Sequence, residues 1–395
     1  MSAHNNTSWH NWLAVSVLGV ASFTVVATEL APIGMLSSIA HDMGRNTGTT
    51  GLVVTLYAWL GAIAALMSIM TISHLPRKPL LIGLMLLLGV CNGISAISHS
   101  FEMLLTARLI GAIAHGAFWA MIGTMGAQLV STNNIGRATA IIFGGVSMAS
   151  VFGVPLINWI SSHSSWRLSF SFLAIISIVT AITLALSLPQ VSGTTRLGIN
   201  QFYSVLKNTM LRKVYLIAAC AIVAHFAAFT YIEVLLSSAS ALPSSWIVIC
   251  LFTFGIAGIC GNFVCGIFID SHLKKVLSLG LMLIALCLGL MNAAIDTNLA
   301  IILLLVSGWG FGVAILFVAV QAWILRLAGS DALPASAIYA SIFNGAVGFG
   351  AILGAGLLNT WGIKTLYLTA AFVTLFSLAL VLIAKNSSAK YVVTE

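Results

Sequence analysis

The sequence predicts an all-α polytopic membrane protein with twelve transmembrane helices in two parallel six-helix halves. Composition indicates the class: 60% of the 395 residues are hydrophobic and only 6% are charged, whereas soluble domains carry roughly 25% charged residues. Length indicates the number of helices, because twelve apolar runs reach about 18 residues or more, enough to cross a bilayer. Strands of a membrane barrel are short and alternating, so these long continuous runs indicate helices.

The twelve predicted spans follow one another with short loops, except at the middle of the chain. One long polar loop, Pro189 to Lys213, leaves six spans on each side. We therefore expect an N-terminal bundle over residues 1–188, a cytoplasmic linker over 189–212 and a C-terminal bundle over 213–395. The spans cover residues 12–36, 50–72, 79–98, 103–130, 138–160, 167–188, 213–237, 246–269, 276–295, 299–326, 338–360 and 363–384.

Lysine and arginine are distributed unevenly over the predicted loops. With the N-terminus in the cytoplasm, twelve of the 16 basic residues fall in cytoplasmic segments, three fall in the opposite loops, and Arg108 lies within a span. Membrane proteins keep excess Lys and Arg on the cytoplasmic side, so both termini are predicted to be cytoplasmic. The same bias accounts for the net charge of +8 without a nucleic-acid partner. Met1 to Asn11 lacks basic residues, so we expect no cleaved signal peptide.

Two segments recur at an offset of about 200 residues, the signature of an internal duplication. Residues 73–78 recur as residues 271–275. The sequence Gly-Leu-Met-Leu follows a few residues after each copy, at 83–86 and at 280–283. Residues 143–145 in the fifth span recur as 343–345 in the eleventh. Because each half holds an even number of spans, both halves are expected to insert the same way up.

This organisation resembles the major facilitator superfamily, whose two halves are parallel repeats. The family's signature loop follows the second helix and is repeated after the eighth. Here the second copy matches best, with Gly266 and Asp270 followed by Lys274 and Lys275. The first copy, residues 71–78, keeps a basic pair and lacks both Asp and Gly.

Motifs within the spans indicate which branch of this superfamily the chain resembles. Residues 104–111 resemble the family's L-x3-R-x2–3-G pattern, and residues 145–155 resemble the glycine/proline motif of proton-coupled antiporters. Residues 28–34 resemble the first-helix motif of twelve-helix drug/proton antiporters. With residues 57–59 and 114–119, the chain resembles bacterial sugar efflux transporters most. The resemblance implies a proton-coupled exporter in a bacterial inner membrane.

Glu29 is a carboxylate inside the first apolar span, where an acidic side chain near mid-membrane costs roughly 2.5–3.5 kcal/mol. At 1.5 Å per residue, Glu29 lies roughly 10 Å and Arg108 roughly 8 Å from the outer ends of their spans. We therefore expect the two to pair or to share a network. The interpretation is a proton-coupling site in which Arg108 modulates Glu29. The alternative is a static structural ion pair.

Polar and aromatic side chains near the middle of the spans are candidates for substrate binding, because such transporters bind substrates near the midplane between the repeats. Polar groups suit the hydroxyls of a sugar, and aromatic rings suit its apolar face. Helix packing and helix–helix hydrogen bonds are the competing interpretation. The predicted substrate-binding residues are Tyr57, His115, Phe118, Trp119, His225, Tyr231, Glu233 and Asn344.

Two further groups have predicted mechanical roles. Gly145 and Gly153 in the fifth span, and Gly350 and Gly354 in the eleventh, have the small-residue spacing of close helix contacts. We therefore expect the fifth and eleventh helices to be the sliding contacts between the halves. Cytoplasmic charges are interpreted as a latch for the outward-open state, against the alternative of positive-inside charge alone. The latch residues are Arg77, Lys78, Asp270, Lys274 and Lys275.

The predicted function is proton-coupled export of small polar solutes, sugars or glycosides, by alternating access. The alternatives are a broad-specificity drug/proton antiporter, a proton-coupled importer or uniporter, and a non-transporting membrane sensor or enzyme. No HxxxxD, HExxH, DxD or GxSxG motif occurs, and the six cysteines show no metal-ligand spacing. We therefore expect no enzyme, no metal and no cofactor beyond the proton gradient. The expected partners are a small-molecule substrate, protons and membrane lipids, with the chain as a monomer.

Overall fold

The computed structural model describes residues 9–122, 125–131, 134–193, 198–240 and 242–384. These residues form helices and loops, without a strand among them. Eleven of the described helical segments are long and apolar enough to cross a membrane. The last, Pro334–Ile383, has 50 residues, over twice the roughly 20 that one crossing needs, and Gly362 interrupts it at φ 79°. The chain is thus a multi-pass membrane protein, consistent with twelve crossings.

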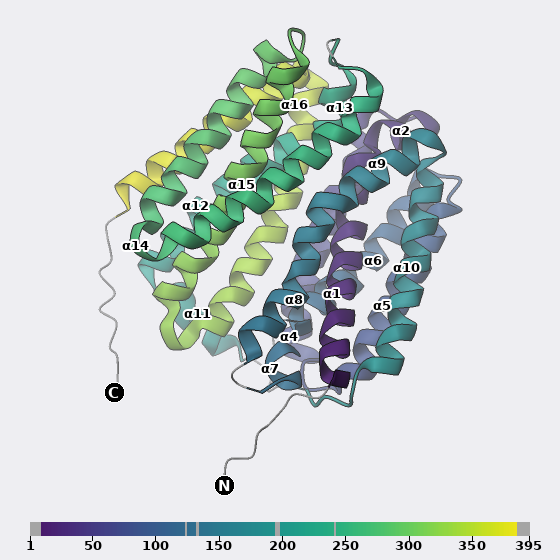
Figure 1. The fold of residues 1–395 in the computed structure, drawn as a ribbon, viewed down its shortest axis with the longest axis vertical. Coiled ribbons are helices and arrows are strands. Elements are labelled where there is room, and N and C mark those ends of the chain that lie inside the picture. The colour runs from purple at the N-terminus through teal and green to yellow at the C-terminus, as the bar shows by residue number, and fades with distance from the viewer. Residues whose placement is uncertain (1–8, 123–124, 132–133, 194–197, 241, 385–395) are drawn as a thin grey trace.

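Figure 1 shows two groups of helices side by side. In the first group α1 packs on α8 and α10, α4 on α6, and α5 on α6 and α10. Their bounds, with those of the shorter helices, are α1 Trp9–Leu30, η1 Ala31–Gly34, α2 Leu36–Asp42, α3 Thr47–Thr50, α4 Leu52–Thr71, α5 Arg77–Ala96, α6 Phe101–Ile122, α7 Met125–Leu129, α8 Ile135–Met148, η3 Ala149–Gly153, α9 Val154–His163 and α10 Trp166–Ser187. Helix α11, Ile199–Lys207, lies between the two groups in the chain and packs on α12 and α16.

In the second group α14 packs on α15 and α16, and α12 packs on α16. Helix α14 contains two predicted spans, which meet at a break at His272 (φ −135°, ψ 34°). The bounds are α12 Thr209–Phe229, α13 Ile232–Ser237, η4 Ser244–Trp246, α14 Ile247–Ala294, α15 Leu299–Ala328, η5 Gly329–Asp331 and α16 Ala332–Ile383.

Three predicted spans differ from the structure near their ends. The first changes from α-helix to a 3₁₀ turn at Ala31, because Pro32 has no backbone N–H to continue the helix. The seventh divides between α12 and α13. The fourth ends at Ile122 rather than at residue 130, and α7 follows. Hydropathy did not reveal these ends, because the apolar composition continues past each of them.

The glycines predicted to make close helix contacts in the fifth and eleventh spans pack against helices of their own half. A Cβ on Gly145 would overlap the Gly19 carbonyl of α1, and one on Gly153 would lie 3.4 Å from the Cβ of Ala27. A Cβ on Gly354 would likewise overlap the Ala227 carbonyl of α12. These two residues are the repeat counterparts of Gly153 and Ala27. These positions hold α8 and η3 on α1, and α16 on α12. The fifth and eleventh spans do contact the other half, through η3 and α9 on α14 and through α16 on α4, but these glycines face their own half; sliding stays a prediction.

Other residues form the contact between the halves. Helix α4 packs along α16, where Trp59 Nε1 donates to the Gly345 carbonyl at 3.2 Å and a Cβ on Gly348 would overlap the Trp59 ring. A Cβ on Gly255 of α14 would likewise overlap Val151 of η3. Both helix pairs approach at backbone distance, which leaves little freedom for sliding in this conformation.

Candidate functional site

Glu29 lies in the last turn of α1, directly before the break at Ala31. Its carboxylate oxygen Oε2 is 3.7 Å from Nε2 of His115 on α6, and the side chains are 13% and 1% exposed. Helical side chains tilt toward the N-terminus of their helix, so the Glu29 carboxylate is directed back along α1. It thereby reaches His115, which is two turns further along α6 than Arg108.

Arg108 binds the backbone of the same α1 turn. Its Nη1 donates to the Thr28 carbonyl at 2.7 Å, and its Nη2 donates to the Glu29 carbonyl at 3.2 Å. The Thr28 carbonyl needs a donor because the residue four positions on is Pro32, which has no N–H. Arg108 replaces that missing hydrogen bond, and its guanidinium lies 4.0 Å from the Tyr57 ring centroid. Arg108 and Glu29 are therefore in contact through the Glu29 backbone; the coupling role of the pair stays a prediction.

His115 joins residues of both halves. Its ring packs edge-on to Tyr57 at 5.3 Å and to Trp119 at 6.3 Å. A Cβ placed on Gly61 would lie 3.4 Å from His115 Cδ2 and 3.9 Å from Oδ1 of Asn344 on α16. Asn344 thus brings an amide from the second half to the imidazole. Phe118 packs on Trp119 at 5.7 Å and is fully buried, as part of the first-half core.

Three buried polar atoms at this place lack a well-aligned hydrogen bond among the described residues. They are Tyr57 Oη, His115 Nδ1 and Asn344 Oδ1, although the Asn344 side chain lies within reach of the His115 ring. Buried polar atoms in proteins are nearly always paired, so a cluster of unpaired ones needs an explanation. Together with the Glu29 carboxylate they form a compact polar site on α1, α4, α6 and α16, suited to a ligand with hydroxyl or amide groups.

The second half carries aromatic rings at the equivalent positions. At the repeat offset of about 200 residues, Glu29, Tyr57 and Arg108 correspond to Phe229, Phe254 and Trp309. The aromatic trio is also in mutual contact, with Trp309 at 5.4 Å from Phe254 and 5.9 Å from Phe229. His225 lies among these rings, stacked on Phe229 at 5.1 Å. Its Nδ1 has no partner among the described residues, and its ring contacts all lie in its own half.

Tyr231 and Glu233 lie at the contact between the halves. The Tyr231 hydroxyl donates to the Ala351 carbonyl at 2.9 Å, and a Cβ on Gly51 of the first half would overlap that hydroxyl. Glu233 Oε2 accepts from the Ser37 amide at the start of α2 at 3.0 Å. Its Oε1 accepts from Ser237 Oγ at 2.8 Å. These residues therefore join α13 to the first half at the α2 end of the molecule, rather than joining His115.

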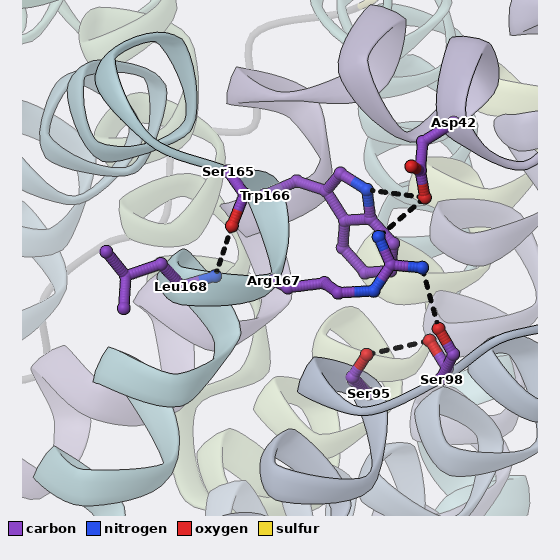
Figure 2. A network of polar contacts seen from close by, with 7 residues as sticks. All are labelled: Asp42, Ser95, Ser98, Ser165, Trp166, Arg167 and Leu168. Carbon is purple, nitrogen blue, oxygen red and sulfur yellow. Dashed lines mark hydrogen bonds and ion pairs between the residues drawn. The ribbon is translucent and has the colours of Figure 1, made fainter.

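The other end of α2 is anchored to its own half by a network that Figure 2 shows. Asp42 Oδ2 accepts from Arg167 Nη1 at 2.6 Å and from Trp166 Nε1 at 3.2 Å, and Arg167 Nη2 donates to the Ser98 carbonyl at 2.9 Å. The hydrogen bond from Arg167 lowers the pKa of Asp42 below its usual value. This network was not predicted from the sequence, although Arg167 is one of only three Lys or Arg residues in the loops predicted to lie outside.

We expect Asp42→Asn to lower stability by less than about 1 kcal/mol, because the ion pair is partly exposed and screened. A carboxylate with a depressed pKa stabilises the fold above its unfolded-state pKa and loses that contribution as pH falls through the folded value. As the pH is lowered below about 4, the melting temperature of the wild type should therefore decrease. The decrease should be smaller in the Asp42→Asn variant. Thermal unfolding in detergent measures both. Asp296→Asn is the control, since its Lys364 partner is 3.9 Å away and both are exposed; an equal effect of both variants would contradict the prediction.

Among the predicted latch residues, Lys274 has its described side-chain contacts within its own half. Its Nζ donates to the Ala384 carbonyl and lies 5.9 Å from the Trp323 ring. The Arg77 side chain is buried, Lys78 is half-buried and Lys275 is exposed. The side chain of Asp270 lies outside the described set. The latch role therefore stays a prediction.

A cleft of about 990 Å³ separates α1 and α8 of the first half from α14 of the second. None of the predicted substrate-binding residues lines it. Each helix contributes one face at spacings of three, four and seven residues. The lining residues are Ser16, Gly19, Val20, Phe23, Ile141, Gly144, Gly145, Met148, Ile259, Asn262, Phe263, Gly266 and Ile267. The sequence does not reveal this cleft, because it depends on how far apart the two halves lie.

Comparison with known proteins gives the same architecture. The family model of the Major Facilitator Superfamily matches residues 17–333. The crystal structure of the human organic anion transporter MFSD10 (TETRAN) is similar to this chain with a TM-score of 0.69 and 16% sequence identity. The match covers 94% of this chain and 99% of that one. At this identity the likeness shows a shared fold.

Proposed function

Because the chain belongs to the major facilitator superfamily and is a secondary transporter, we propose that it exports a small solute in exchange for protons by alternating access. Buried, unpaired polar atoms of Tyr57, His115 and Asn344 beside the Glu29 carboxylate support the proposal. This site joins helices of both halves, so motion of the halves changes it. A proton on Glu29 and a hydroxyl of the solute would compete for the same carboxylate, which is the requirement for exchange.

The solute is proposed to be a sugar or glycoside. Unpaired hydroxyl, imidazole and amide atoms match the donors and acceptors of sugar hydroxyls, and Trp119 next to His115 offers a ring face. The second candidate is broad-specificity export of drugs, which the apolar lining of the cleft favours. A proton-coupled importer would use the same site, and the direction of flux in inverted vesicles separates it from the exporter. A sensor or enzyme role would leave the polar site at the junction of the halves unexplained.

We place the protein in a bacterial inner membrane with both termini cytoplasmic, as a monomer of two bundles, 1–188 and 213–395, joined by the linker. In this orientation the α2 and α13 end faces outside and is closed by Glu233. The cleft near the start of α1 then faces the cytoplasm. The conformation would thus be inward-facing, and the latch pairs at the cytoplasmic face would form in the opposite state.

Tyr57→Phe tests the substrate role of the unpaired hydroxyl. We expect sugar binding to weaken by roughly tenfold, the scale of one lost buried hydrogen bond, with the melting temperature unchanged because this hydroxyl has no protein partner. Tyr215→Phe is the control, since its hydroxyl donates to the Ala335 carbonyl at 2.9 Å and its loss should lower stability without weakening binding. Calorimetric titration with sugars and with hydrophobic cations at two pH values measures both. Unchanged sugar affinity in Tyr57→Phe would refute the assignment.

A further inference from the structure

The cleft between α1, α8 and α14 is apolar and carries no charge. Its lining contains neither an acidic nor a basic residue. Ser16 already donates to the Trp12 carbonyl at 3.0 Å, so the Asn262 amide is the main polar group that the lining offers. Phe263 and Ile267 on its rim are 73% and 71% exposed, so the cleft opens onto the exposed apolar surface of α14.

Two glycines keep the cleft open. A Cβ added to Gly144 of α8 or to Gly266 of α14 would meet no atom within 4 Å, whereas the neighbouring Gly145 is packed against α1. Gly144 and Gly266 are therefore not required for helix contacts, and their bare backbone widens the space between the halves. The volume of about 990 Å³ is at the upper end of the roughly 300–1,000 Å³ of small-molecule pockets.

We propose that this cleft receives the apolar chain or ring of a neutral amphipathic solute, such as an alkyl glycoside, directly from the bilayer. The proposal rests on the transport function above and adds the substrate class and its route. A phospholipid head group carries a phosphate, and the uncharged lining offers it no counter-charge. A neutral polar head has Asn262 nearby, and the cleft lies between the moving halves, where a transported molecule must pass.

The test uses the full chain in nanodiscs with a photoreactive octyl glucoside that carries a diazirine in its alkyl chain. We expect labelled peptides from the cleft faces of α1, α8 and α14, with labelling displaced by octyl glucoside and not by methyl glucoside. Gly144→Leu and Gly266→Leu should reduce labelling by roughly tenfold, because added methylenes fill the space that the chain needs. Gly83→Leu is the matched control, since Gly83 on α5 also meets no atom within 4 Å and lies outside the cleft lining.

Three results would overturn the proposal. They are labelling spread evenly over all lipid-facing helices, labelling unaffected by the two leucine variants, and labelling by a diazirine phospholipid that octyl glucoside does not displace. Should the leucine variants fail to fold, Ile267→Cys in a Cys260→Ser background gives a second measurement: octyl glucoside should protect it from maleimide. Labelling needs no proton gradient, so absent labelling with intact proton-driven flux refutes this inference alone. Labelling without proton-coupled flux refutes the proposed function alone.

Discussion

Glu29→Gln is expected to abolish substrate-driven proton flux in proteoliposomes, by roughly a hundredfold or more, the scale at which removal of a positioned proton-transfer group acts. Glutamine keeps the size of the side chain and its proximity to His115, so substrate binding should persist and become independent of pH. The measurement pairs proton uptake, followed by an internal pH dye, with calorimetric binding at two pH values.

Glu102→Gln is the control for that experiment. Glu102 lies in the first turn of α6 and pairs with Arg45 at 2.9 Å, with side chains 70% and 46% exposed. Its loss should leave proton flux unchanged, because an exposed pair contributes little. Surviving substrate-driven proton flux in Glu29→Gln would show that the coupling role belongs to another group.

Arg108→Leu is expected to destabilise the protein by about 2–5 kcal/mol. It leaves the carbonyls of Thr28 and Glu29 without their donor, at about 1–3 kcal/mol for each buried unpaired group, and it removes the guanidinium from the Tyr57 ring. Thermal and denaturant unfolding in detergent measure the loss.

The cause of that loss can be isolated through Pro32. In a Pro32→Ala background, residue 32 regains an N–H that can bond the Thr28 carbonyl, so Arg108→Leu should cost less there than in the wild type. A double-mutant cycle measures the difference as a coupling energy, expected at about 0.5–3 kcal/mol. Additive effects of the two substitutions would show that Arg108 does not substitute for the missing backbone donor of Pro32.

The fold was predictable because membrane crossing imposes a simple rule on composition. A run of about 20 apolar residues is required wherever a helix spans the bilayer, and this chain has so few charges that each run is visible. Helix ends were less predictable. Pro32 was visible in the first span, yet only the structure shows that the break leaves the Thr28 carbonyl for Arg108.

The candidate site was partly predictable from depth along the helices. Depth placed Glu29 and Arg108 at one level, where they are in contact. Depth alone could not show that Arg108 binds the backbone carbonyl of Glu29 and not its carboxylate. It also could not show that the Glu29 carboxylate is directed toward His115. Glu233 was predicted to bind substrate near the middle of its span. The break between α12 and α13 places Glu233 at the Ser37 amide instead, because a short separate helix need not follow the direction of the span before it.

Helix α2 is held at its start by Glu233 of one half and at its end by Asp42 contacts within the other. If that face opens in the proposed transport cycle, the hydrogen bond from the Ser37 amide to Glu233 must break, and the Asp42 contacts keep α2 on the first half. A hydrogen bond to a charged group is worth about 1.5–3 kcal/mol, which corresponds to a slowing of roughly 10- to 150-fold. In the proposed transport cycle, a contact of that strength would favour the closed face while slowing its opening by no more than this factor.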